Sequence, residues 1–336
     1  MSPSISTLGE RELIARLQQR VPAPPAHVRV GIGDDAAVIA PARNMDDVVT
    51  TDSLVEGVHF RRDWSTAESI GDKALAVNLS DLAAMGATPR VSLLSLALPA
   101  DFALADFDAL LDGYLARSAS SGTSLVGGNL TRSPGPLIVD VTVIGSVGHR
   151  HVLTRTGARK GDELYVTGAI GAAAAGLAML HAGRTRDSLD DAASACIERY
   201  ERPEPRLRCG RIVGRTRAAS AAIDLSDGFS DAAWRLAEGG NVGLVVDAAA
   251  LPMAAGAAAW ARDIGQDPIG FALAGGEDYE LAFAVPTRRR SRFLAAVRRC
   301  AGLTVTRVGV FGGEAGVWLD RDGTKAPLPR TGFAHF

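Results

Sequence analysis

Lysine and cysteine are scarce in this sequence, and each shortage narrows what the chain can do. Lysine occupies 3 of the 36 basic positions, and the other basic residues are arginine. Because the chain is also rich in alanine, this excess of arginine indicates a coding bias rather than a binding surface. The 3 cysteines are scattered, with no CxxC pair and no paired histidine. This argues against a zinc site and against a disulfide scaffold, and it suits a reducing cytoplasm.

Strong net charge and long apolar runs are missing as well. The formal net charge is -2, so we expect no broad attraction to nucleic acid or to an anionic membrane. The longest uncharged run, residues 164–183, is mostly glycine and alanine and is too weakly apolar for a good membrane span. The N-terminus has no basic segment followed by an apolar one, so no signal peptide is expected.

Several motifs of nucleotide and acyl chemistry are also absent. The sequence has no G-x-x-x-x-G-K-[ST] run, no HRD and DFG set, and no G-x-S-x-G. A Walker-type nucleotide site, a protein-kinase fold and covalent acyl chemistry are therefore unsupported. We expect no covalent nucleophile in this protein.

The chain has 336 residues, of which 47% are hydrophobic, which is ordinary for a globular protein of about two domains. Strand-like and helix-like segments alternate in both halves, and a basic, glycine-bearing connector follows at residues 149–161. We predict an α/β (α+β) protein with two domains. The first covers residues 1–149 and holds a mixed sheet, and the second covers residues 150–336 and holds a sheet flanked by helices.

Carboxylates recur at predicted strand ends and helix starts, beside glycine, serine, threonine or asparagine. Oxygen ligands of this kind suit hard divalent cations. Magnesium takes only one or two protein carboxylates per ion and completes its shell with water and substrate phosphates, so a nucleotide site with several magnesium ions needs scattered acids. The acids are Asp34, Asp35, Asp52, Asp81, Asp224, Asp227, Glu277 and Asp278.

Asp34 and Asp35 stand in the stretch VGIGDDAAVI, which predicts two short strands joined by a glycine-rich turn. Aspartate and glycine are ordinary turn residues, so a plain turn is one interpretation. Adjacent like charges repel, however, unless a cation lies between them, and no basic residue stands nearby. A metal ion would supply the missing positive charge, and a bound triphosphate would be the other partner of that ion.

Other candidates have structural interpretations too. Ser226 and Asp227 can cap a helix, and Asp52 can end the strand-like run that precedes it. His59 can be a satisfied, partly buried histidine. Lys73 is best explained as part of a solvated helix face.

The candidates for binding phosphate are a glycine turn and an arginine. Residues 127–129, with the sequence GGN, are predicted to form a turn after the strand-like residues 124–126, and Arg155 lies in the connector. Phosphoryl transfer requires mainly positioning and charge neutralisation, which acids, a glycine turn and one or two arginines can supply.

The ordered motifs resemble the thiamine-monophosphate kinase family, within the superfamily of aminoimidazole-ribonucleotide synthetase and selenophosphate synthetase. The resemblance covers nearly the whole chain, and VEGVHF with NLSDLAAMGA favours the thiamine enzymes over their relatives. The nine blocks are GIGDDAAV (31–38), TTDSLVEGVHF (50–60), KALAVNLSDLAAMGATP (73–89), LVGGN (125–129), LTRTGARKGDELYVTG (153–168), ERYERPEPRL (198–207), AIDLSDG (222–228), LAGGEDYEL (273–281) and GFAHF (332–336).

The resemblance implies direct transfer of the γ-phosphate of ATP to thiamine monophosphate, the final step of thiamine diphosphate synthesis, with several magnesium ions and no phosphoenzyme. It also implies a homodimer whose N-terminal domains pair their sheets, with the active site between the two domains of a subunit. The implied magnesium ligands are Asp35, Thr50, Thr51, Asp52, Asp81, Asp224 and Asp227. The implied nucleotide contacts are Gly128, Asn129, Arg155 and Ser226, and the implied substrate contacts are His59, Glu277 and Phe333.

Two positions depart from the family pattern. The family commonly has GGD where this chain has GGN, so Asn129 keeps an oxygen ligand and loses a charge. A magnesium site there is weaker or filled by water, and Asn129 is retained as a nucleotide contact. Phe333 stands where relatives often have tyrosine or tryptophan, and it keeps a stacking face without a hydroxyl.

Two alternatives to the kinase stay open. One is another ATP-dependent synthetase of the same superfamily, although the absence of cysteine before Cys196 counts against the selenophosphate branch. The other is a sensor of thiamine phosphate or nucleotide without catalysis, for which Asn129 is the only support.

Overall fold

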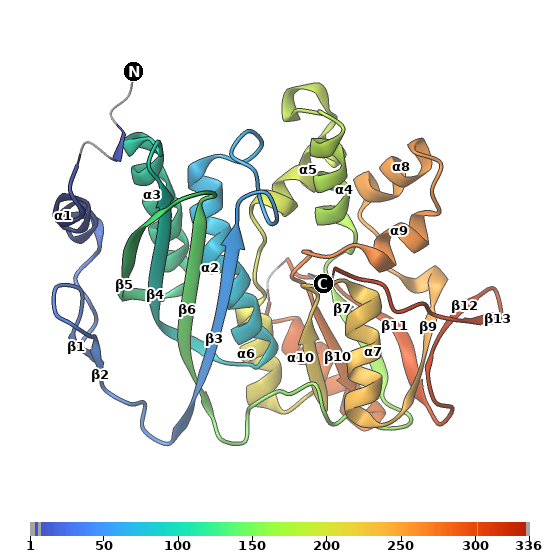
Figure 1. The fold of residues 1–336 in the computed structure, drawn as a ribbon. Helices are drawn as coiled ribbons and strands as arrows, with labels where there is room; N and C mark the ends of the chain where they lie inside the picture. Colours follow the sequence, from blue (N-terminus) through green and yellow to red (C-terminus); the bar gives the residue numbers. More distant parts are fainter. Residues whose placement is uncertain (1–3, 6–7, 301, 334–336) are drawn as a thin grey trace. The chain divides into compact units, whose positions relative to one another are not determined.

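The computed structural model describes residues 4–5, 8–300 and 302–333. The chain divides into two compact units, the first formed by Met1–Leu82 with Thr88–Val147 and the second by Ala83–Ala87 with Gly148–Phe336. Each unit holds one main sheet with helices packed on it (Figure 1), so the predicted mixed α/β class is confirmed. Among the helices of the described residues, none is long and apolar enough to cross a membrane.

The main sheet of the first unit has the strand order β3-β6-β4-β5, with β4 parallel to β5 and antiparallel to β6. Along β4, Leu94, Leu96 and Leu98 are buried while Leu93 and Ser95 are half-buried. This alternation gives one face to helices α2 and α3 (Figure 1) and leaves the other face more open. The elements are α1 (Glu10–Arg20), β1 (Val28–Val30), β2 (Val38–Ile39), β3 (Met45–Val55), α2 (Ala67–Ala84), β4 (Thr88–Pro99), α3 (Leu104–Ser121), β5 (Ser124–Ser133) and β6 (Ile138–Gly148).

Helices α2 and α3 touch backbone to backbone, and glycine makes this possible. A Cβ atom on Gly71 would lie 1.9 Å from the carbonyl oxygen of Leu110, and one on Gly113 would lie 1.9 Å from that of Glu68. Side chains from residue 69 to residue 80 of α2 are all buried. A helix that is covered on all sides is mostly apolar or small. The charged side chains that this one buries are bonded, Asp72 to Arg117 and Lys73 to the carbonyl oxygen of His59.

Two predictions about strand ends are wrong. Residues 127–129 form no turn but lie inside β5. Residue 128 must be glycine because a Cβ atom there would stand 1.8 Å from the carbonyl oxygen of Leu94 in the neighbouring strand. The glycine thus serves the close approach of two parallel strands. Asp52 does not end its strand either, since β3 continues to Val55.

The second unit is built on a seven-stranded sheet with the order β13-β12-β9-β11-β7-β10-β8. Its central strands are buried on both faces: Ala282 and Ala284 of β10 join the cluster with Phe229 of α7, while Phe283 packs against Phe293 of α10. The elements are β7 (Glu163–Thr167), α4 (Ala172–His181), α5 (Asp191–Glu201), α6 (Leu207–Thr216), β8 (Ala221–Asp224), α7 (Phe229–Gly240), β9 (Gly243–Asp247), α8 (Ala255–Asp263), α9 (Pro268–Ala274), β10 (Leu281–Val285), α10 (Arg290–Val297), β11 (Val305–Gly312), β12 (Val317–Arg321) and β13 (Thr324–Pro327).

Candidate functional site

In the first unit, two glycine-rich segments line one cavity of about 1000 Å³ on the open face of the sheet. They are residues 31–37, between β1 and β2, and residues 127–129 of β5. The structure therefore brings Asp35 to the same cavity as Gly128 and Asn129. A cavity of this size is large enough for a nucleotide-sized ligand.

A polar row crosses the sheet at this cavity. Asn129 of β5 pairs with Ser95 of β4, and Ser95 pairs with Asp140 of β6. Ser53 of β3 extends the row, because its hydroxyl donates to Oδ2 of Asp140. Asp140 also lines the cavity, and the sequence analysis missed it. The signal was available, since this aspartate stands on the strand face opposite Val139, Val141 and Val143.

The turn that holds the adjacent aspartates is shaped by one of them. Oδ1 of Asp34 accepts the main-chain N–H of Asp35 at 2.8 Å. Both residues are exposed in the part of the chain that lines the cavity. Asp34 therefore stabilises the turn, and the carboxylate of Asp35 is presented to solvent.

The predicted threonine ligands point in different directions. The hydroxyl of Thr50 donates to Oδ2 of Asp81 on α2 at 2.5 Å. Strand alternation places Asp52 on this same helix-facing side of β3. Thr51 lies on the opposite side, where its hydroxyl donates to the carbonyl oxygen of Val141 at 3.2 Å. The structure thus joins Thr50 and Asp81 directly and separates Thr51 from them.

His59 follows β3 in a tight turn, where its Nδ1 atom accepts the main-chain N–H of Val55 at 3.1 Å. In the neutral ring the proton therefore lies on Nε2. Lys73 of α2 donates from Nζ to the carbonyl oxygen of His59 at 3.3 Å and is only 2% exposed. The prediction of a solvated Lys73 is wrong, because this lysine is buried and holds the His59 turn from the helix side.

In the second unit, the AIDLSDG and LAGGEDYEL motifs lie side by side. The N–H of Glu277 donates to the carbonyl oxygen of Ser226 at 2.7 Å, and that of Tyr279 donates to Leu225 at 3.1 Å. Glu277 and Tyr279 have φ angles of +65° and +49°, which are uncommon for residues other than glycine. Backbone strain of this kind collects at functional sites.

Asp278, between these strained residues, is almost fully buried at the start of α4. Its carboxylate accepts the N–H groups of Gly171 at 2.6 Å and of Ala173 at 3.1 Å. Burial raises the pKa of Asp278 to about 7, although the two amide hydrogen bonds act in the opposite direction. Asp278 therefore anchors the loop that carries Glu277, a role that its sequence alone did not reveal.

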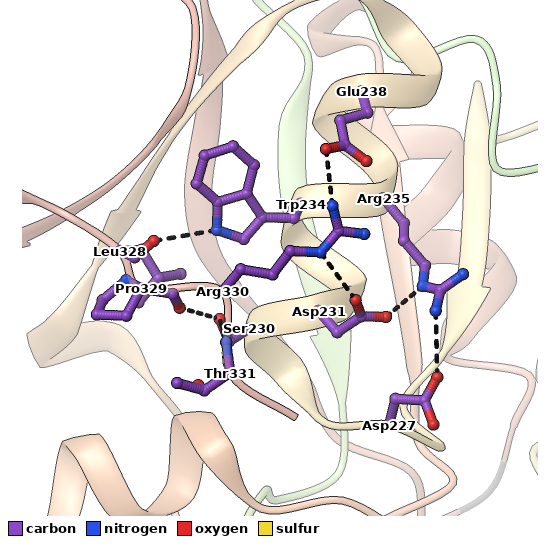
Figure 2. Close-up of polar contacts among 10 residues, drawn as sticks. All are labelled: Asp227, Ser230, Asp231, Trp234, Arg235, Glu238, Leu328, Pro329, Arg330 and Thr331. Atoms are coloured by element: carbon purple, nitrogen blue, oxygen red, sulfur yellow. Dashed lines mark hydrogen bonds and ion pairs between the residues drawn. The ribbon is translucent and has the colours of Figure 1, made fainter. Parts of the chain in front are cut away.

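Asp227 precedes α7 and is held there by two contacts. Its Oδ2 atom lies 3.4 Å from Nη2 of Arg235, and its carbonyl oxygen accepts the N–H of Phe333 at 3.2 Å. Figure 2 shows the Arg235 guanidinium between Asp227 and Asp231. Asp224, at the end of β8, is 3% exposed. The structure therefore brings Asp227 close to the aromatic residue predicted to contact substrate.

Arg155 lies apart from this group. Its carbonyl oxygen packs on Gly239, where an added Cβ atom would stand 2.6 Å away, near the C-terminal end of α7. Ser226 and Asp227 precede the other end of that helix, and its 12 residues correspond to a length of about 18 Å. The predicted residues 334–336 of the GFAHF block lie outside the described residues.

Within the described part of the chain, no three histidine, cysteine, aspartate or glutamate side chains form a cluster that could hold a metal ion. The predicted ligands instead form two smaller groups, one in each unit. The first contains Thr50 with Asp81, and the second contains Asp227 beside the LAGGEDYEL loop.

Comparison with known proteins gives consistent matches along the chain. The AIR synthase related protein N-terminal domain matches residues 33–147, and the corresponding C-terminal domain matches residues 159–319. Thiamine-monophosphate kinase of Escherichia coli K12 is 38% identical over 332 residues, which cover 98% of this chain and 98% of that protein. The enzyme of Bacillus subtilis 168 is 34% identical over 92% of this chain and 94% of its own.

Solved structures agree with these matches. Thiamine-monophosphate kinase from Stenotrophomonas maltophilia K279a is 36% identical with a TM-score of 0.80, covering 94% of this chain and 96% of its own. AaThiL complexed with AMPPCP and TMP is 31% identical with a TM-score of 0.77 and covers 100% of both chains. The hydrogenase maturation protein HypE of E. coli has a TM-score of 0.79 at 18% identity over 97% of this chain and 99% of its own, which shows a shared fold alone.

Proposed function

This chain belongs to the thiamine-monophosphate kinase family, and we propose that it transfers the γ-phosphate of ATP to thiamine monophosphate. The products are thiamine diphosphate and ADP. The observation that carries this proposal is the 38% identity to the E. coli kinase over 98% of both chains. AaThiL, which matches the whole chain, was captured with AMPPCP, an ATP analogue, and TMP.

Magnesium is the proposed cofactor, and the available donors fit it. They are carboxylate and hydroxyl oxygens, which a hard cation prefers, while the three cysteines are free thiols buried in the second unit. Bound magnesium supplies positive charge that neutralises the transferring phosphates. The residues proposed to hold it are Asp35, Thr50, Thr51, Asp52 and Asp81 of the first unit, and Asp224 and Asp227 of the second.

The protein itself supplies positioning rather than a nucleophile. A phosphate oxygen of thiamine monophosphate attacks the γ-phosphorus of ATP, a new P–O bond forms, and the bond to the bridging β-phosphate oxygen breaks with ADP as leaving group. No side chain becomes covalently attached in this direct transfer. The geometry of such a step depends on the residues that align the two phosphates.

Nucleotide contacts are assigned to Gly128, Asn129, Arg155 and Ser226. Gly128 and Asn129 line the first-unit cavity, where the glycine presents main chain to a ligand without a side chain in the way. The amide of Asn129 offers both a donor and an acceptor, so it suits a nucleotide better than a metal ion.

Contacts to thiamine monophosphate are assigned to His59, Glu277 and Phe333. In the neutral ring of His59, Nδ1 accepts the N–H of Val55 and Nε2 carries the proton, so the ring offers a donor type that suits a phosphate oxygen. The carboxylate of Glu277 suits the cationic thiazolium ring. Phe333 is 49% exposed and offers an aromatic face for stacking.

The further proposals concern organisation and location. Residues 1–149 are proposed to bind ATP and magnesium and to dimerise, and residues 150–336 to complete the active site. A homodimer formed through the N-terminal domains is proposed from the family resemblance. The free state of all three cysteines supports a cytoplasmic location.

Asp35→Asn tests the catalytic proposal. Thiamine diphosphate and ADP are measured by chromatography with ATP, magnesium and thiamine monophosphate. Loss of a residue that hydrogen-bonds a metal ligand typically lowers activity roughly 10- to 100-fold, so loss of a direct ligand should lower it at least as much. Thermal unfolding should be unchanged. Asp101→Asn, at another exposed acid of the first unit, is the control and should keep full activity.

Normal turnover of Asp35→Asn at saturating magnesium would refute the assignment of this ligand. Tight binding of thiamine monophosphate by the wild-type protein without any turnover would favour a sensor over a kinase. Turnover with a different acceptor would favour another synthetase of the superfamily.

A further inference from the structure

The last described residues, 328–333, lie along α7 and are called here the C-terminal strap. Ser230 of α7 is fully buried and bonds the strap twice. Its hydroxyl donates to the carbonyl oxygen of Pro329 at 2.6 Å and accepts the N–H of Thr331 at 3.2 Å (Figure 2). One side chain thus fixes the main chain on both sides of Arg330.

Arg330 adds a side-chain latch between the strap and α7. Its Nε atom donates to Oδ1 of Asp231 at 3.2 Å, and its Nη1 atom donates to Oε1 of Glu238 at 2.8 Å (Figure 2). The two acceptors are seven residues apart, so they lie on one face of the helix, two turns from each other. Trp234 on the same face donates from Nε1 to the carbonyl oxygen of Leu328 at 3.0 Å.

The strap delivers Phe333 to the start of α7. The N–H of Phe333 donates to the carbonyl oxygen of Asp227 at 3.2 Å. A Cβ atom on Gly332 would stand 2.5 Å from that same oxygen, so the close approach requires glycine there. The main chain of Phe333 is thereby fixed, whereas its large apolar side chain stays 49% exposed.

We propose that Arg330 and Glu238 are positioning residues, which hold the C-terminal strap on α7 and so set Phe333 against the thiamine end of the substrate. This inference rests on the proposed function, in which Phe333 contacts thiamine monophosphate. In this proposal each charged side chain acts through the strap and not through a contact with substrate. ATP is assigned no contact on the strap, and the side chain of Asp227, a proposed magnesium ligand, is held by Arg235 rather than by the strap. Recognition of ATP should therefore be independent of the latch.

Arg330→Gln and Glu238→Gln, alone and together, test this proposal. The matched control is Arg321→Gln, because Arg321 is also 45% exposed, belongs to the same unit and pairs with Asp267 in a surface ion pair. Two quantities are measured in each variant. The first is the KM of each substrate, and the second is hydrogen exchange of the peptide that contains the strap, in enzyme without substrates.

Arg330→Gln should raise the KM for thiamine monophosphate about two- to five-fold, the range expected for losing exposed ion pairs. The KM for ATP should stay unchanged, and exchange in the strap should become faster. Glu238→Gln should shift both quantities in the same direction by less, because Asp231 still holds Arg330. The double variant should resemble Arg330→Gln, and Arg321→Gln should resemble wild type.

Three results would overturn the latch. They are strap exchange in Arg330→Gln equal to wild type, faster exchange with an unchanged KM for thiamine monophosphate, and equal increases in both KM values. Absence of thiamine diphosphate formation in the wild-type enzyme would instead defeat the proposed function. The exchange comparison still reports on the latch in that case, so the two failures are distinguishable.

Discussion

Glu280→Gln should lower the free energy of unfolding of the second unit by about 3–5 kcal/mol, the cost of breaking a buried ion pair. Glu280 is fully buried and accepts Nε of Arg206 at 2.7 Å and the hydroxyl of Thr167 at 2.7 Å. Nη2 of Arg206 makes the second, parallel bond. Glutamine keeps the shape of the side chain, but it leaves the Arg206 guanidinium, only 16% exposed, without the carboxylate that binds it through two hydrogen bonds.

The reverse change, Arg206→Met, should cost a similar amount because it leaves the charge of the buried Glu280 with the longer 3.8 Å contact to Arg199 in place of its pair with Arg206. Independent losses would add to roughly 6–10 kcal/mol in the double variant. The double variant removes the Arg206–Glu280 pair as a whole, however, which avoids the desolvation cost of that pair, and Arg199, whose Nη2 lies 3.8 Å from Oε1 of Glu280, is 26% exposed and can be solvated. We therefore expect its loss to be no greater than that of either single variant.

Unfolding of the second unit can be followed separately. Trp64 lies in the first unit, whereas Trp234, Trp260 and Trp318 lie in the second. In a Trp64→Phe background, fluorescence during urea titration therefore reports the second unit alone, which avoids mixing two transitions. A double variant that loses the sum of both singles, or Glu280→Gln within about 1 kcal/mol of its parent, would refute the reasoning.

Two further predictions concern the first-unit strand and the pH dependence of stability. Gly128→Ala should lower the free energy of unfolding by at least about 3 kcal/mol, since an added Cβ atom meets the carbonyl oxygen of Leu94 at 1.8 Å. Gly135→Ala, with open space around it, should be close to neutral in thermal unfolding. Equal melting temperatures of the two variants would contradict this. Because burial raises the pKa of Asp278 to about 7, the folded state keeps a proton that the unfolded state loses near pH 4. Its contribution to stability is therefore present below pH 4 and decreases by up to about 1.4 kcal/mol per pH unit towards pH 7. The difference in unfolding free energy between wild type and Asp278→Asn should follow that slope, and a difference that is flat or rises with pH would exclude it.

The fold class follows from sequence because alternating strand and helix patterns are local properties. The errors concern positions where a distant residue decides the outcome. Gly128 has the composition of a turn, yet the carbonyl oxygen of Leu94 on the neighbouring strand explains why glycine stands there. A lysine is ordinarily solvated, but Lys73 lies on the buried part of α2 and bonds the His59 turn, 14 residues away.

In the candidate site, too, local motifs could be identified from the sequence, whereas contacts with distant residues could not. The acids stand in recognisable motifs, so resemblance could assign them to metal and substrate. The residues that hold those motifs could not be assigned in this way, because their partners are remote in sequence. Asp278 depends on the amides of Gly171 and Ala173, which are 107 and 105 residues away. The strap depends on Arg330 meeting Asp231, 99 residues earlier.

The arginine excess, interpreted from composition as a coding bias, also has a structural use. Among the described residues, four arginines bind carboxylates that are 45 to 127 positions away through Nε and Nη2 together: Arg16 with Asp108, Arg117 with Asp72, Arg206 with Glu280 and Arg290 with Glu163. A planar guanidinium fixes both the distance and the orientation of its partner, which the single ammonium group of lysine does not. These pairs therefore fasten elements in a defined geometry rather than merely neutralise charge. A codon bias explains why arginine is available to this chain, and the paired geometry explains why lysine would not serve at these four positions.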